Sequence, residues 1–218
     1  MDAQTLEPAD ERIIAGNAYV RGEMRKPVYV RSADDWYREP ASAVHVLLDV
    51  EHFGRTIWDP ACGAGNVPDT AKARGYQVVG SDLVDRAEGR FITPMDFLEV
   101  GRVAGFVKAH RVDSIVTNPP FNRAREFVTT ALAMGPHKVA VLQRLAWPEG
   151  VDRSAWMRQT PLARVWVFPW RLSMPPGDSD VTAKGGAVAF AWYVWERGWR
   201  GPAQLGWLPS APANGGAA

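Results

Sequence analysis

Short apolar runs and helix-like patterns alternate along the middle of this chain. Each apolar run has the length of a buried strand, and most end directly before a polar residue. Helical patterns, such as those over residues 67–74 and 123–134, lie between the runs. Strands that alternate with helices predict a parallel α/β sheet. The predicted strands are residues 56–58 before Asp59, residues 76–81 before Asp82, residues 114–117 before Asn118, and residues 138–142.

The last third of the chain has a different pattern. Two apolar runs, residues 164–168 and 187–195, follow each other with no helical pattern between them. Strands connected without a helix commonly pair antiparallel. We therefore predict a mostly parallel, twisted α/β sheet with an antiparallel hairpin at one edge.

Composition limits the class of protein. The chain has 218 residues, of which 46% are hydrophobic and 22% charged, and these values exclude a mainly disordered chain. The formal net charge of +1 excludes nucleic-acid binding by global charge alone, but it leaves room for a local basic face. A single cysteine excludes an internal disulfide and a cysteine-rich zinc site. Four scattered histidines argue against a histidine cluster, so no metal site is expected.

The ends of the chain differ from its middle. Residues 1–30 are polar without a sustained period, and residues 209–218 are small residues and breakers. We expect an N-terminal arm over 1–30, one domain over 31–208 and a flexible tail over 209–218. The longest apolar run is too short to cross a membrane, and no signal-peptide pattern is present. These features predict a soluble, cytoplasmic protein with no membrane partner.

A loop with two glycines follows the first predicted strand. It runs Asp59-Pro60-Ala61-Cys62-Gly63-Ala64-Gly65, and the glycines let the backbone turn tightly beside a ligand. In open parallel sheets, ligands bind beyond the carboxyl ends of the strands. Asp82 lies at the end of the second predicted strand, where an acid can accept hydrogen bonds from both hydroxyls of a ribose.

This loop departs from the known phosphate-binding motifs. A dinucleotide motif needs a third glycine where this chain has Pro68, and no Gly-Lys-Ser/Thr motif is present. A glycine loop with a ribose-binding acid and no phosphate cradle suits an adenosyl ligand without phosphates, for which S-adenosylmethionine is the candidate. The alternative is a plain tight turn. In either case Cys62 is interpreted as a small loop residue and not as a nucleophile.

The third predicted strand leads directly into Asn118-Pro119-Pro120-Phe121. The prolines stiffen the backbone and remove two N–H donors, which leaves the Asn118 side-chain oxygen and the Pro119 carbonyl as acceptors. Such a corner suits a planar NH2 group, and Phe121 can stack on the ring that carries this group. Hydrogen bonds from both N–H groups favour a pyramidal nitrogen whose lone pair can attack a methylsulfonium. The alternative is a rigid turn with no ligand.

Taken together, these motifs resemble those of S-adenosylmethionine-dependent amino-methyltransferases, and more closely the small phage and prophage type of DNA adenine-N6 methyltransferase. The resemblance implies a Rossmann-like class I methyltransferase fold, S-adenosylmethionine as cofactor, and DNA, duplex or single-stranded, as partner. It also implies that Asn118, Pro119, Pro120 and Phe121 hold the target adenine. The matching segments lie between residues 35 and 208, at residues 36–40, 57–63, 117–121, 142–145 and 191–195.

The same resemblance assigns the cofactor contacts. It places Asp59, Pro60, Ala61, Gly63 and Gly65 around the methionine part, Asp82 on the ribose, Leu83, Asp96 and Phe97 at the cofactor's adenine, and Asn118 beside the cofactor. One position departs from the pattern, because such enzymes usually have Thr-Pro where this chain has Glu39-Pro40. Glu39 would repel the carboxylate of the cofactor unless it turns away.

Little of the chain is available for recognising a DNA sequence. Only 97 residues follow Phe121, and they must also complete the sheet. Residues 172–186, a polar and breaker-rich loop, are the candidate for DNA contact. We expect short or relaxed sequence specificity, or recognition helped by dimerisation. Two or three arginines are candidates for phosphate contact, and most of the set is expected to be solvated surface. The set expected on or near the catalytic face is Arg123, Arg125, Arg144, Arg153, Arg158, Arg164 and Arg171.

Other interpretations stay open at this stage. The same Asn-Pro-Pro-aromatic corner serves enzymes that methylate an RNA base or the side-chain amide of a protein glutamine. Cytosine-N4 methylation is a further alternative, although that chemistry usually has serine in place of Asn118. A non-catalytic nucleic-acid-binding module with the same fold is the alternative from another class. Among the many tryptophans, Trp166, Trp192 and Trp195 are expected to pack in the core, and Trp170 and Trp199 are left open.

Overall fold

The computed structural model describes residues 19–20, 23–24, 34–178, 186 and 188–210. Most of the predicted arm and tail, and residues 179–185 of the loop predicted to contact DNA, lie outside the described residues. In the arm, β1 (Tyr19–Val20) pairs antiparallel with β2 (Glu23–Met24). The boundaries proposed for the arm, the domain and the tail therefore stay predictions.

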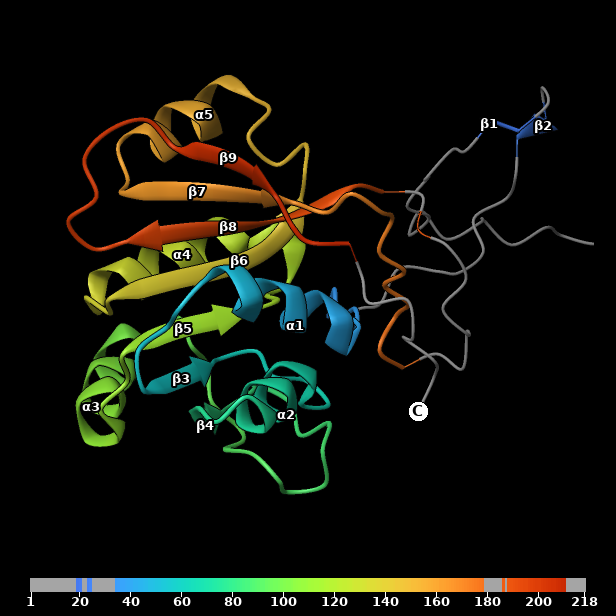
Figure 1. Ribbon diagram of the computed structural model, residues 1–218. Coiled ribbons are helices and arrows are strands. Elements are labelled where there is room, and N and C mark those ends of the chain that lie inside the picture. The colour runs from blue at the N-terminus through green and yellow to red at the C-terminus, as the bar shows by residue number, and fades with distance from the viewer. Residues whose placement is uncertain (1–18, 21–22, 25–33, 179–185, 187, 211–218) are drawn as a thin grey trace, which may run out of the picture.

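A seven-stranded mixed sheet organises the fold, in the order β4-β3-β5-β6-β8-β7-β9 (Figure 1). The half from β4 to β6 is parallel, and β8 pairs antiparallel with both β6 and β7. The strands are β3 (Thr56–Asp59), β4 (Gln77–Gly80), β5 (Ser114–Thr117), β6 (Lys138–Arg144), β7 (Leu162–Val167), β8 (Phe190–Glu196) and β9 (Gln204–Trp207).

The four strands predicted from apolar runs are all present, and β7 and β8 form the predicted antiparallel pair. The strand β9 is an addition to that prediction. It lies outside the hairpin and pairs parallel with β7. Its sequence, Gln-Leu-Gly-Trp, contains a glycine and is largely exposed, so it lacks the apolar run that marks a buried strand.

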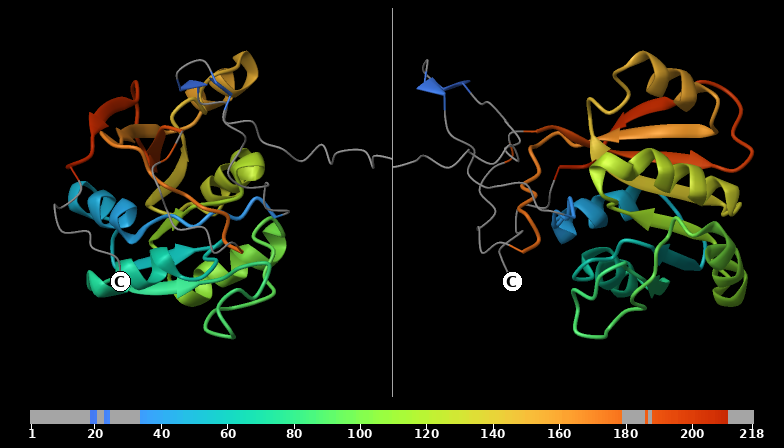
Figure 2. Two further views of the ribbon diagram at one scale, coloured as in Figure 1. Left: turned by 90° about the vertical axis from the view of Figure 1, so that its right-hand side faces the viewer. Right: turned by 180° about the vertical axis from the view of Figure 1, so that it is seen from behind.

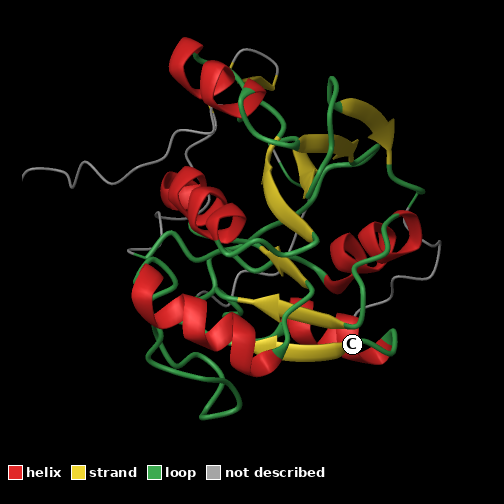
Figure 3. Cartoon of the chain, turned by 90° about the vertical axis from the view of Figure 1, so that its left-hand side faces the viewer, coloured by secondary structure: helices red, strands yellow, loops and turns green. Residues whose placement is uncertain are grey.

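In the part of the chain that the structure describes, α-helices lie on both faces of the sheet (Figure 3). The helices α1 (Ala41–Val50) and α2 (Asn66–Ala73) pack on one face. The helices α3 (Val100–His110), α4 (Ala124–Ala133) and α5 (Val151–Arg158) lie on the other, as the view from behind shows (Figure 2). Within the part of the chain that the structure describes, none of these helices has the length and apolar character of a membrane span.

Alternation along the strands divides the core into two layers. In β3, Ile57 joins the layer under α1 and α2, while Trp58 joins the layer under α3 and α4. Successive strand side chains point to opposite faces, so a central strand must be apolar at every position. Trp192 and Trp195 are fully buried, as predicted, and the Trp192 indole N–H donates to the carbonyl of Ala43 in α1 (2.9 Å).

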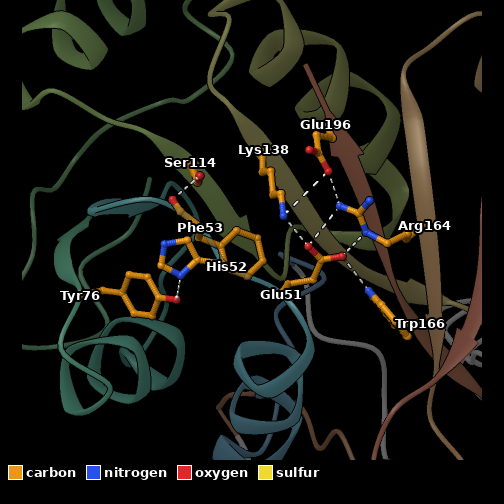
Figure 4. Close-up of polar contacts among 9 residues, drawn as sticks. All are labelled: Glu51, His52, Phe53, Tyr76, Ser114, Lys138, Arg164, Trp166 and Glu196. Carbon is orange, nitrogen blue, oxygen red and sulfur yellow. Dashed lines mark hydrogen bonds and ion pairs between the residues drawn. The ribbon is translucent and has the colours of Figure 1, made fainter. Parts of the chain in front are cut away.

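A buried ionic network lies at the end of α1 opposite its N-terminus (Figure 4). Lys138 donates to Glu51 (2.6 Å), and Arg164 forms ion pairs with both Glu51 and Glu196. The Trp166 indole also donates to Glu51 (2.9 Å), so this tryptophan is structural, as predicted. Arg164 therefore lies far from the catalytic face, contrary to prediction, because its side chain neutralises the buried Glu51 carboxylate.

Candidate functional site

Three polar side chains meet where the parallel strands end. Asp59 ends β3, Asp82 follows β4 by two residues, and Asn118 directly follows β5. Among these three strands β3 lies in the middle, with β4 and β5 on opposite sides of it. The strand order therefore reverses at the end of β3, and open α/β sheets bind ligands at such a point.

The glycine loop is held tightly against the end of β4. Gly63 (φ 51°) and Gly65 (φ 103°) have left-handed backbones, which favour glycine. The backbone N–H of Gly63 donates to the Asp82 carboxylate (2.8 Å). A Cβ on Gly63 would lie 2.6 Å from the indole nitrogen of Trp36, so this glycine is also required by a close contact. Pro68 lies in the first turn of α2, where its missing N–H leaves no helical bond unmade.

Asp82 lies at the predicted ribose position and already has several donors. Besides Gly63, the backbone N–H of Val84 (3.0 Å) and the guanidinium of Arg86 (2.8 Å) donate to its carboxylate. Arg86 also pairs with Asp34 (2.7 Å) and lies over the Trp36 ring (4.6 Å from guanidinium carbon to ring centroid). A ribose at Asp82 would therefore compete with Arg86 for lone pairs of one carboxylate.

The Asn118 side-chain amide is hydrogen-bonded through its nitrogen, whereas its oxygen has no partner among the described residues. Its Nδ2 donates to the carbonyl of Tyr37 (2.8 Å) and to the carboxylate of Glu39 (2.8 Å). Its Oδ1 is buried and accepts no hydrogen bond from the described residues. Buried acceptors are rarely left without a donor, and an exception of this kind marks a position for a ligand donor or water. The amide is therefore oriented to accept, as the proposed role in binding an NH2 group requires.

The Phe121 ring already has neighbours in this structure. Tyr37 stacks on it at 5.5 Å between ring centroids, with an interplanar angle of 13°, and Phe190 lies tilted at 5.7 Å. The Arg144 guanidinium carbon lies 5.5 Å from the Phe121 centroid, and the Arg144 Nε has no partner among the described residues. A planar base that stacks on Phe121 would have to displace one of these contacts.

Glu39 and Asp59 are two buried carboxylates of the site, and Glu39 lies close enough for its charge to influence Asp59. Burial raises the pKa of Glu39 to about 7. Burial, and next the charge of Glu39, raise the pKa of Asp59 well above its usual range. Within the described residues, no lysine or arginine forms an ion pair with either acid. Uncompensated buried acids suit a cationic ligand, which would favour their ionised form.

Glu39 makes contacts on two sides of the site. Its carboxylate turns to the Asn118 amide, and its backbone carbonyl accepts a hydrogen bond from the Asn66 side chain (2.6 Å). Glu39 thus links the glycine-loop side of the site to the Asn118 corner. Sequence inspection missed this link because the two residues are 79 positions apart.

A pocket lies between the glycine loop, Glu39 and Asn118, and its cavity volume is only about 10 Å³. This is about the space of one water molecule and far below the roughly 300–1,000 Å³ usual for a small-molecule site. A ligand the size of a nucleoside therefore requires side chains such as Trp36 to move. The pocket is lined by Trp36, Tyr37, Arg38, Glu39, Ala61, Cys62, Gly63, Ala64, Asn66 and Asn118.

The remaining predicted residues are spread around the site. Leu83 is exposed (57%), and the Asp96 carboxylate accepts from the Leu98 N–H (2.9 Å) at the turn before α3. Phe97 is almost fully buried and makes an edge contact with Trp58 (5.1 Å). The Phe97 ring is part of the core, and its contact with a cofactor stays a prediction.

Cys62 has no nucleophilic character in this environment. Its side chain is buried, and burial followed by the charges of Asp59 and Asp82 raises the pKa of its thiol. The thiolate is the reactive form of cysteine, so a raised pKa leaves the thiol inert. This agrees with the interpretation of Cys62 as a small loop residue. Among the described residues, no three His, Cys, Asp or Glu side chains lie together in a metal-binding arrangement.

Sequence comparison and structural comparison give different results. No protein-family model matches this sequence, and no curated protein matches it. The modification subunit of a proposed type I restriction enzyme from Vibrio vulnificus matches in structure, with a TM-score of 0.56 and 16% identity. That match covers 79% of this chain and 46% of the Vibrio chain.

Together with the strand order and the loop after β3, this match decides the fold class. This chain has the class I methyltransferase fold. At 16% identity the likeness is one of fold, and the chain spans less than half the length of the Vibrio protein.

Two more distant structures have TM-scores below 0.5. A proposed RNA methyltransferase from Pyrococcus horikoshii has a TM-score of 0.48 and 17% identity, covering 73% of this chain and 85% of that one. A SAM-dependent methyltransferase from Archaeoglobus fulgidus has a TM-score of 0.47 and 13% identity, covering 72% and 92%.

Proposed function

We propose that this protein transfers a methyl group from S-adenosylmethionine to the exocyclic N6 amine of adenine in DNA, with short or relaxed sequence specificity. The observation that carries the proposal is the unpartnered Asn118 Oδ1, buried beside a pocket that also contains Gly63 and Glu39. An acceptor without a donor, next to uncompensated acids, suits a target amine beside a cationic cofactor.

The glycine loop and the acids near it suit this cofactor in charge, and the loop backbone can approach a ligand once Trp36 moves. The left-handed turn at Gly63 and Gly65 leaves no Cβ between backbone and ligand. Asp59 and Glu39 offer negative charge to the ammonium and sulfonium groups, and Asp82 offers acceptors to a ribose once Arg86 moves. When bound, S-adenosylmethionine supplies a methyl group whose bond to N6 forms as its bond to sulfur breaks, with the electron pair passing to sulfur and one amine proton released.

The Asn118 corner would hold the acceptor base. Asn118 Oδ1 and the Pro119 carbonyl would accept from the two amine hydrogens, while the ring of Phe121 supports the base by stacking. In duplex DNA the adenine would first have to leave the stack and enter this corner. Arg144 lies over Phe121 with its Nε unpartnered among the described residues, which supports a contact between Arg144 and the phosphate or base at the corner.

The test offers methyl-labelled S-adenosylmethionine and purified protein to duplex DNA, single-stranded DNA, RNA and a protein extract in separate reactions. Label in DNA that is recovered as N6-methyldeoxyadenosine after digestion supports the proposal. Label only in RNA or in protein glutamine would keep the role of Asn118 and overturn the substrate. Cofactor binding with no transfer to any substrate would favour a non-catalytic module.

The matched control is Asn118→Ala, because this change removes the acceptor at the reacting amine and leaves the glycine loop unchanged. Transfer should be lost, whereas the dissociation constant for the cofactor should stay within about threefold of the original. If cofactor binding is lost as well while the protein stays folded, the separate roles of the corner and the loop are wrong.

A further inference from the structure

The amide of Asn118 can serve the proposed reaction in only one orientation. Its two ends have nearly the same shape, but Oδ1 accepts hydrogen bonds whereas Nδ2 donates them. A target amine needs an acceptor, so a flipped amide would place a donor against a donor. Something in the protein must therefore choose the orientation.

Two acceptors at Nδ2 make this choice. The Tyr37 carbonyl and the Glu39 carboxylate each lie 2.8 Å from Nδ2. In the flipped amide, Oδ1 would face both of these oxygens and be repelled by them. A hydrogen bond to a carboxylate is stronger than one to a neutral carbonyl, so Glu39 supplies the larger part of the preference.

Glu39 is itself held in place. It directly precedes Pro40, at the start of α1, and its own carbonyl accepts from the Asn66 side chain of α2 (2.6 Å). The residue is only 8% exposed. The first turns of two helices thus fix the backbone that carries the carboxylate, which is the support that an oriented amide needs.

We propose that Glu39 is a positioning residue for methyl transfer: it holds the Asn118 amide with Oδ1 turned toward the acceptor amine. This role rests on the proposed function. It also accounts for a glutamate at a position where its charge was expected to repel the carboxylate of the cofactor. In this role Glu39 acts on the acceptor amine through the Asn118 amide, separately from any effect of its charge on the cofactor.

Two variants of equal charge and similar length separate positioning from electrostatics. Glu39→Gln removes the charge but keeps an oxygen that can accept from Nδ2, whereas Glu39→Met removes both the charge and the acceptor. Any effect of charge on the cofactor is therefore common to the two variants. With cofactor and DNA saturating, kcat should be about tenfold to a hundredfold lower for Glu39→Met than for Glu39→Gln, because only the methionine variant lacks the acceptor.

A second readout does not depend on activity. In a ¹⁵N-resolved spectrum, the side-chain amide protons of Asn118 are assigned by their loss in Asn118→Ala. A carboxylate acceptor should hold one of them downfield in the original protein, and Glu39→Met should shift it toward the position of a free amide. Glu39→Ala serves in place of Glu39→Met if the latter does not fold.

The outcomes separate the two proposals. Equal kcat in the Gln and Met variants, together with an unmoved Asn118 amide signal, would overturn the positioning role while methyl transfer by the original protein stands. If the wild-type protein methylates no substrate, the proposed function is overturned. The chemical shift of the Asn118 side-chain amide would still decide whether Glu39 holds Asn118. A loss of kcat specific to Glu39→Met, with the matching shift, supports the positioning role.

Discussion

The Gly63 backbone N–H donates to the Asp82 carboxylate across 2.8 Å, and together with the bond from the Cys62 N–H to the Ser81 carbonyl (3.0 Å) it joins the loop after β3 to the end of β4. The two segments flank the position expected for the cofactor. Asp82 therefore shapes the glycine loop, and in the proposed function it also offers acceptors to a ribose. Perturbing it should affect cofactor binding first.

Asp82→Ala should weaken cofactor binding by about 1–3 kcal/mol, because charge-assisted hydrogen bonds are lost and Gly63 loses its acceptor. Titration calorimetry measures the dissociation constant directly. Asp82→Asn is the matched control, since it keeps an acceptor for Gly63 but removes the charge. An unchanged constant in Asp82→Ala would place the ribose elsewhere.

Arg86→Ala should tighten cofactor binding by roughly threefold to tenfold, because a ribose would no longer displace the guanidinium from Asp82. The same comparison at high salt should show a smaller difference, since added ions weaken the ion pair. Weaker binding in Arg86→Ala would instead mean that Arg86 holds the Asp82 carboxylate in its binding position.

Cofactor binding should release protons just below neutral pH. Burial raises the pKa of Glu39 to about 7, so in the free protein its carboxyl is partly protonated in that range. A cation bound nearby favours the ionised form, which lowers the pKa and expels the proton. Affinity should then increase as the pH rises toward about 7, and the heat of binding should depend on the buffer's ionisation enthalpy. Identical heats in two buffers of different ionisation enthalpy would contradict the prediction. Glu39→Gln should reduce the proton release.

The ionic network around Glu51 should govern stability and not activity. Burial opposes its ionisation, but hydrogen bonds from Arg164 and Lys138 outweigh this and lower the pKa of Glu51. The pKa of Glu51 is 4.5 in the unfolded chain and lower in the folded protein. Ionised Glu51 therefore stabilises the folded state at pH values above 4.5, and this stabilisation is lost as the pH falls through the pKa of the folded protein.

Removing this carboxylate should therefore be costly at neutral pH. Glu51→Ala should lower the free energy of unfolding by about 3–5 kcal/mol, because it leaves Lys138 and Arg164 charged and without their main partner. Chemical denaturation at neutral and at acid pH measures the effect, which should shrink in acid. An equal loss at both pH values would assign the effect to packing.

Several residues of the candidate site could be predicted from local patterns in the sequence. The apolar runs before Asp59 and Asn118 specify strands, because side chains buried on both faces of a central strand must be apolar throughout. The residue types at the strand ends then indicate the chemistry. By contrast, β9 went unpredicted because a short, exposed strand gains its stability from pairing with β7 and not from its own composition.

The sequence by itself determined which groups stand at the ends of the strands: the left-handed turn at Gly63, the acid at Asp82 and the acceptor at Asn118. Only the tertiary structure decided what surrounds them. It turned Glu39 toward Asn118, brought Arg86 to Asp82 and stacked Tyr37 on Phe121. Backbone propensities and apolar periodicity act over a few residues, whereas these contacts join segments that the folded sheet brings together. Their hydrogen bonds and charges leave no periodic trace in the chain.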